Sequence, residues 1–173
     1  RSSNGNEIKR ATAKNLTFEN IAFESYTRKG IDVIGVVDCI SPYVIEDIER
    51  LIEKGELREK KGGGMEYRKG QVLILGAELE THEKRGCSAH SLCFFPSLKT
   101  LKDFAKDITK HIKNIYNCSS ICRLTGQQLF DMVEYYGGTY IPAHIFTPHK
   151  SFYGNCCDSL LEIFNEKSFE KIP

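Results

Sequence analysis

Three short apolar stretches of the sequence each end in a side chain that can bind a metal ion or transfer a proton. Asp38 follows VIGVV, Glu78 follows LILGA, and His144 follows YIPA. Each stretch has the length and composition of a buried strand. Because side chains at the carboxyl ends of parallel strands converge on the functional face of an α/β sheet or barrel, we expect these three residues to lie together.

A fourth candidate, His90, begins the strand-like stretch SAHSLCFF. Only eleven residues, 79–89, separate it from Glu78, and they contain no helical run. A parallel crossover needs a dozen or more residues and usually a helix. We therefore predict a hairpin-like return of the chain, which places His90 beside Glu78.

Carboxylates and imidazoles that gather without thiolates suit zinc, manganese or iron, which activate water and stabilise charge on a phosphoryl group. The predicted ligands of this divalent metal site are Asp38, Glu78, His90 and His144. The two carboxylates, Asp38 and Glu78, are also the predicted catalytic groups. For each residue alone the alternative is structural, namely an acid that caps the following turn or a core histidine satisfied by protein groups.

The surroundings of His144 favour a ligand role. The strand predicted over 139–143 holds the backbone before the histidine, and Pro148 stiffens the loop after it. A ligand histidine donates its second ring N–H to an outer partner, for which a backbone carbonyl or Thr147 is available. Phe146 is left to shield the site or to stack on a base.

The elements that must position these residues alternate along the chain. IDVIGVVD and VLILGAE are typical of strands buried on both faces, and SAHSLCFFP and TYIPA are further strands. Helices are predicted over residues 17–29, 42–54, 97–116, 125–136 and 158–165. Residues 60–70 are predicted to form a flexible polar excursion. This alternation predicts an α/β fold with a parallel sheet or barrel.

Composition narrows the class of protein. The chain of 173 residues is 40% hydrophobic and 27% charged, which suits one globular domain with a substantial core. The net charge of +1 gives no indication of binding to nucleic acid or to a membrane surface, although a local basic site is still possible. The longest apolar stretches are too short to span a bilayer. Seven cysteines without a C-x-x-C pair predict reduced thiols in a cytoplasmic protein.

Four segments together resemble a known family: GIDVIGVVDCISP, LILGAELET, GCSAHSLCFFPSL and GGTYIPAHIFTPHKSFYG. They resemble the PHP (polymerase and histidinol phosphatase) phosphoesterase superfamily, and more narrowly its endonuclease Q-like branch. The resemblance covers nearly the whole chain. It implies a distorted (β/α)7 barrel around two or three metal ions, zinc or manganese, with Glu78, His90 and His144 as ligands.

This chain also departs from the sequence pattern of the family that it resembles. Cys39 and Ile40 follow Asp38 where the superfamily has an acid closely followed by a histidine. The first-strand H-x-H motif and a late Asp-x-His motif are absent, so residues 1–173 are expected to form a single PHP-like domain that is incomplete at both ends.

The activity implied by the resemblance is hydrolysis of DNA beside deaminated bases or abasic sites. The candidates for binding phosphate or substrate are Arg10, Lys14, His149 and Lys150. A small-molecule phosphatase of the histidinol-phosphate kind is one alternative. Another alternative is a non-catalytic binding module that kept the barrel and lost the metal. Ile40 after Cys39 favours this alternative.

Overall fold

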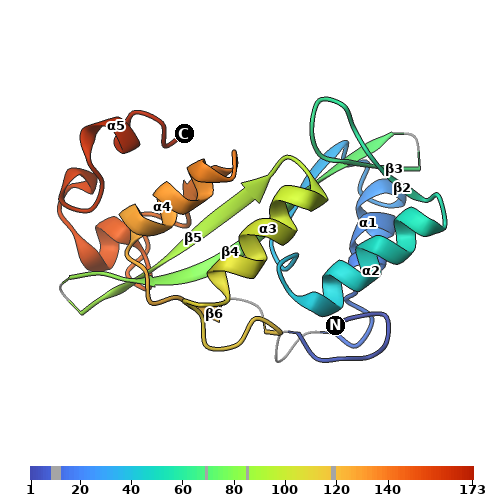
Figure 1. Ribbon diagram of the computed structural model, residues 1–173, viewed down its shortest axis with the longest axis horizontal. Helices are drawn as coiled ribbons and strands as arrows, with labels where there is room; N and C mark the ends of the chain where they lie inside the picture. Colours follow the sequence, from blue (N-terminus) through green and yellow to red (C-terminus); the bar gives the residue numbers. More distant parts are fainter. Residues whose placement is uncertain (9–12, 69, 85, 118–119) are drawn as a thin grey trace.

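The protein folds as a seven-stranded mixed sheet with helices packed against it (Figure 1). The computed structural model describes residues 1–8, 13–68, 70–84, 86–117 and 120–173. The strands are β1 (Val33–Val36), β2 (Leu57–Glu59), β3 (Met65–Tyr67), β4 (Gln71–His82), β5 (Ser88–Phe95), β6 (Ser120–Ile121) and β7 (Thr139–Pro142). The α-helices are α1 (Phe18–Thr27), α2 (Pro42–Glu53), α3 (Leu98–Ile108), α4 (Gly126–Tyr135) and α5 (Glu166–Phe169). A π-helical turn, η1 (Phe152–Cys156), and a 3-10 turn, η2 (Leu160–Glu162), precede α5.

The long strand β4 organises the sheet because four other strands pair with it. β1 and β6 run parallel to β4, whereas β3 and β5 run antiparallel to it. β2 extends the sheet beside β3, and β7 extends it beside β5, both in antiparallel pairs. The predicted mixture of helices and strands is confirmed. The predicted parallel sheet is wrong, and over the described residues the sheet does not close into a barrel.

Local sequence signals explain where the helices begin. The side chain of Thr17 accepts a hydrogen bond from the N–H of Asn20 at the start of α1, and Thr125 caps α4 in the same way. Pro42 occupies the first turn of α2, as predicted. The helix expected over 97–116 ends earlier, at Ile108, because the chain then turns to pair with a later segment. In the part of the chain that the structure describes, no helix has the length and apolar character needed to cross a bilayer.

Alternation along β4 and β5 gives the sheet two different faces. One face is covered by α3 and α4 (Figure 1). Ala77 and Leu79 of β4 are fully buried on this face. Phe95 of β5 is buried there too, and its ring contacts α3. Since neighbouring residues of a strand point to opposite sides, Glu78 and His90 lie on the other face. We call this second face of β4 and β5 the open face.

Several elements differ from the sequence expectations. β1 is not buried on both faces, because Val33 is 61% exposed. The segment expected to be a flexible excursion contains β3, which pairs with β2 and β4. Within the helix expected over 158–165, the structure has the short 3-10 turn η2 at Leu160–Glu162. β4 continues to His82, so Glu78 lies within a strand and not at its end.

A disulfide joins Cys87, just before β5, to Cys156 at the end of η1. The expectation of reduced thiols is therefore wrong for this pair. The other cysteines that the structure describes are all buried, namely Cys39, Cys93, Cys122 and Cys157. The disulfide ties the segment that follows β7 to the first residues of β5.

Candidate metal centre

Glu78, His90 and His144 come together beside the open face of the sheet. One ligand atom of each lies within 4.8 Å of the other two. The Nδ1 atom of His90 is 3.0 Å from Oε1 of Glu78 and 3.2 Å from Nε2 of His144. A metal ion with bonds of about 2.0–2.2 Å holds neighbouring ligand atoms ~3 Å apart, so this spacing fits a shared ion. The predicted proximity of the three side chains is observed, and the cluster can hold a metal ion.

The β4–β5 hairpin explains how two of the three residues meet. His90 pairs directly with Glu80, and Glu78 lies two residues before Glu80 on the same face of β4. Both glutamates therefore flank His90. The predicted hairpin return is confirmed, but the cluster forms on the face of the sheet and not at the ends of parallel strands.

His144 reaches the cluster from the end of β7, which is antiparallel to β5. The N–H of Ala143 donates to the carbonyl of His90 at 2.9 Å, so the two histidines are neighbours across this pair of strands. His144 has a φ of 33°, a left-handed conformation that is costly for a residue with a side chain. Such a conformation persists only where the surrounding structure holds it.

Thr147 provides part of that support and assigns the tautomer of His144. Its hydroxyl lies 3.0 Å from the carbonyls of His144 and His149, and it donates its one hydrogen to these acceptors. The hydroxyl oxygen is then left to accept from Nδ1–H of His144, also at 3.0 Å. From this hydrogen-bond network we assign the lone pair to Nε2, the atom that faces the cluster. The sequence left a backbone carbonyl and Thr147 open as this outer partner, and the structure has Thr147 there.

Glu80 lies beside the second ring nitrogen of His90. Its Oε2 atom is 3.6 Å from Nε2 of His90 and accepts a hydrogen bond of 2.7 Å from Nζ of Lys150. Nε2 of His90 is buried and has no hydrogen-bond partner among the described residues. Burial raises the pKa of Glu80, but hydrogen bonds from Lys150 and Ser88 and the charge of Lys150 outweigh it, so the pKa lies below its usual value. Glu80 was not among the predicted site residues, although its two-residue spacing from Glu78 was the available signal.

Asp38 is not part of the three-residue cluster. It lies opposite Ala77 in an isolated bridge, one residue away from Glu78 in the register of β4. Its Oδ1 atom is buried and has no hydrogen-bond partner among the residues that the structure describes. The metal-binding and catalytic roles assigned to Asp38 from the sequence stay predictions.

Cys39 is not part of the three-residue cluster. It is fully buried, and its thiol donates to the carbonyl of Val36. Burial raises the pKa of the Cys39 thiol to about 12, so the thiol is protonated near neutral pH. Its burial with Ile40 instead anchors the connection between β1 and α2 in the core.

The predicted phosphate-binding residues have different surroundings. Arg10 lies outside the described residues. Lys14 and His149 are exposed. Lys150 is half exposed and paired with Glu80, and its carbonyl accepts from the N–H of His90 at 2.8 Å. Phosphate binding by these four residues stays a prediction.

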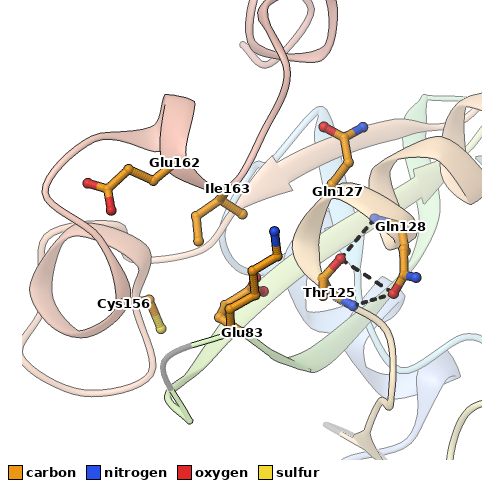
Figure 2. A pocket seen from close by; sticks show the side chains of 8 residues that line it. Glu83, Thr125, Gln127, Gln128, Cys156, Glu162 and Ile163 are labelled. Carbon is orange, nitrogen blue, oxygen red and sulfur yellow. Dashed lines mark hydrogen bonds between the residues drawn. The ribbon is translucent and has the colours of Figure 1, made fainter.

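A pocket of about 410 Å³, lined mainly by polar residues, lies between the start of α4 and the C-terminal segment. Figure 2 shows Thr125 and Gln128 hydrogen-bonded at one side, with Cys156 and Glu162 at the other. Glu83 in this pocket accepts from the N–H of Gly126 at 2.8 Å, so its carboxylate holds the start of α4. The pocket contains none of the three candidate ligands.

No family model matches the chain. The uncharacterized protein YqxK of Bacillus subtilis is 41% identical over 175 residues, covering 99% of this chain and 45% of that protein. The uncharacterized protein MJ0043 of Methanocaldococcus jannaschii is 27% identical over 139 residues, covering 79% of this chain and 15% of that protein. The chain therefore spans less than half the length of these curated relatives.

Two crystal structures resemble the fold. The lesion-specific endonuclease PfuEndoQ from Pyrococcus furiosus superposes with a TM-score of 0.75 at 25% identity, over 91% of this chain and 37% of that chain. The complex of Endonuclease Q with a 27-mer duplex substrate, which has an abasic lesion at the active site, gives a TM-score of 0.75 at 26% identity with the same coverage. The chain has an endonuclease Q-like fold. Membership of the wider PHP superfamily and the (β/α)7 barrel stay predictions.

Proposed function

We propose that the protein is a metal-dependent phosphoesterase that cleaves DNA beside damaged nucleotides. The observation that carries this proposal is the convergence of Glu78, His90 and His144 within 4.8 Å. The fold that holds them is similar to that of a lesion-specific endonuclease. A carboxylate and two imidazoles are a suitable ligand set for zinc or manganese.

The three residues would hold one ion, which supplies activated water and charge for the scissile phosphate. Thr147 fixes the ring of His144, and Glu80 stands beside the outer nitrogen of His90. Asp38 remains our candidate for a further ligand or catalytic carboxylate, which the unpartnered Oδ1 among the described residues supports. The full centre of two or three ions is part of the same proposal.

The proposed substrate is duplex DNA with a deaminated base or an abasic site. Support comes from a structural neighbour that was crystallised with an abasic duplex. Arg10, Lys14, His149 and Lys150 are our candidates for holding the flanking phosphates.

The test is a nicking assay with the full-length protein and added manganese or zinc. Uracil-containing, abasic and undamaged duplexes are compared with simple phosphomonoesters. Metal-dependent nicking of the damaged duplexes, lost on chelation, is the expected result. Hydrolysis of phosphomonoesters alone would indicate a small-molecule phosphatase, and a protein that neither binds metal nor hydrolyses either substrate would be a non-catalytic module.

A further inference from the structure

An aromatic stack lies on the loop that follows His144. The side chain of Phe146 is 78% exposed, yet its ring stacks on Tyr153 with centroids 5.4 Å apart and planes 15° apart. A single exposed apolar residue needs no explanation. Here, however, one side of an exposed ring stacks on a second ring, which presents a flat aromatic surface of fixed orientation.

Backbone hydrogen bonds hold this stack close to the candidate metal centre. Phe146 is two residues after His144, and the N–H of Thr147 donates to the carbonyl of His144 at 3.0 Å. The N–H of Tyr153 donates to the carbonyl of Ile145 at 3.1 Å, which ties the second ring to the same turn. Movement of the stack relative to His144 is therefore restricted.

We propose that Phe146 and Tyr153 form a stacking platform for an unpaired nucleobase next to the scissile phosphate. This inference rests on the proposed function, because it places the base of a bound DNA strand beside the metal that holds its phosphate. Aromatic rings stack on any base, since every base has a π-face. His149 and the half-exposed Lys150 follow on the same loop and suit the phosphates on either side of such a base.

Another exposed aromatic residue provides a contrast. Tyr135 is 82% exposed on α4, but it meets Tyr136 edge-on, at 87°, and presents no stacked pair. The exposed acidic residue Asp131 lies one turn before it and repels a phosphate backbone, and Glu134 beside it is already paired with Lys171. Tyr135 is therefore a matched control: an equally exposed ring in surroundings that do not suit DNA.

The experiment uses duplexes in which 2-aminopurine occupies, in turn, each nucleotide around the lesion, with calcium in place of the active metal to prevent cleavage. The full-length wild type should quench the 2-aminopurine fluorescence at one position. Phe146→Leu should abolish the quenching and weaken binding about tenfold, whereas Phe146→Trp should restore both. Tyr135→Leu should leave both unchanged.

The possible outcomes distinguish a failure of this inference from a failure of the proposed function. If the wild type binds and nicks damaged DNA but Phe146→Leu quenches and binds as well as the wild type, the platform is wrong and the nuclease stands. Equal losses in Phe146→Leu and Tyr135→Leu would also reject the platform. If the wild type neither binds nor nicks damaged DNA, the proposed function fails and the platform fails with it. Because Phe146 is exposed, unchanged metal content and thermal unfolding should show that its variants fold.

Discussion

After β1 the chain passes through Asp38, Cys39 and Ile40 directly into α2, and the last two of these residues are at most 4% exposed. After β7 it passes through His144 into a run of exposed residues, 146–150. In the second connection His144 and Lys150 both have positive φ, at 33° and 52°. The first connection buries apolar side chains, whereas the second holds costly backbone conformations.

Interactions in the first connection stabilise the fold, whereas interactions in the second orient a side chain. Cys39 and Ile40 join the hydrophobic core, so substitutions there are expected to change stability. Around His144, the hydrogen bonds of Thr147 and Ser151 fix one turn and one imidazole ring. Substitutions in this second connection are therefore expected to change metal binding more than stability.

The largest expected effect is that of His144→Gln. This variant should fold, because His144 is exposed, but its affinity for zinc or manganese should fall on the order of a hundredfold, with a similar loss of activity. Isothermal titration with each metal measures the change. His111→Gln, which alters a histidine outside the cluster, is the control. If the two variants bind metal with equal affinity, His144 is not a metal ligand.

Gly154→Ala should come next. A Cβ atom at this position would overlap the carbonyl oxygen of Thr147, so the turn that orients His144 must move. We expect a loss of metal affinity of about ten- to a hundredfold. Gly62→Ala is the matched control, because a Cβ there meets nothing within 4 Å. If both alanine variants bind metal like the wild type, the turn does not hold the ligand.

Thr147→Val tests a single hydrogen bond of the same turn. Valine keeps the shape of the side chain but cannot accept from Nδ1–H of His144. Metal affinity should fall about tenfold, while the midpoint of thermal unfolding should change little. Thr147→Ser, which retains the hydroxyl, should restore the affinity. Failure of serine to do so would contradict the assigned role of the hydroxyl.

Cys39→Ala provides the reverse case in the first connection. It should lower the free energy of unfolding by about 1 kcal/mol and leave metal affinity unchanged. Because the folded pKa of Cys39 is raised from 9.0 to about 12, its contribution to stability is complete below pH 9 and is lost as the pH rises toward 12. The variant should therefore lose less stability than the wild type over this pH range in denaturant titrations. A weaker metal affinity in Cys39→Ala would erase the contrast between the two connections.

Much of the local structure follows from the sequence alone. Thr17, Pro42 and Thr125 mark helix starts because capping and backbone restriction act within a few residues. The short separation of Glu78 from His90 required a hairpin because a parallel crossover needs a longer connection. These predictions depend on neighbours in the chain, which the sequence displays directly.

The tertiary structure decided the register of the strands, the face of the sheet on which each side chain lies, and the outer partners of the histidines. β4 extends past Glu78 to His82 because β5 and β6 pair with it there, and this pairing places Glu80 opposite His90. The same sheet sets Asp38 against Ala77 and outside the cluster, although its position after an apolar strand resembles that of His144. A shift of one residue in register moves a side chain to the other face, and no local pattern specifies that shift. Strand pairing between distant segments therefore selected which of the predicted ligands meet.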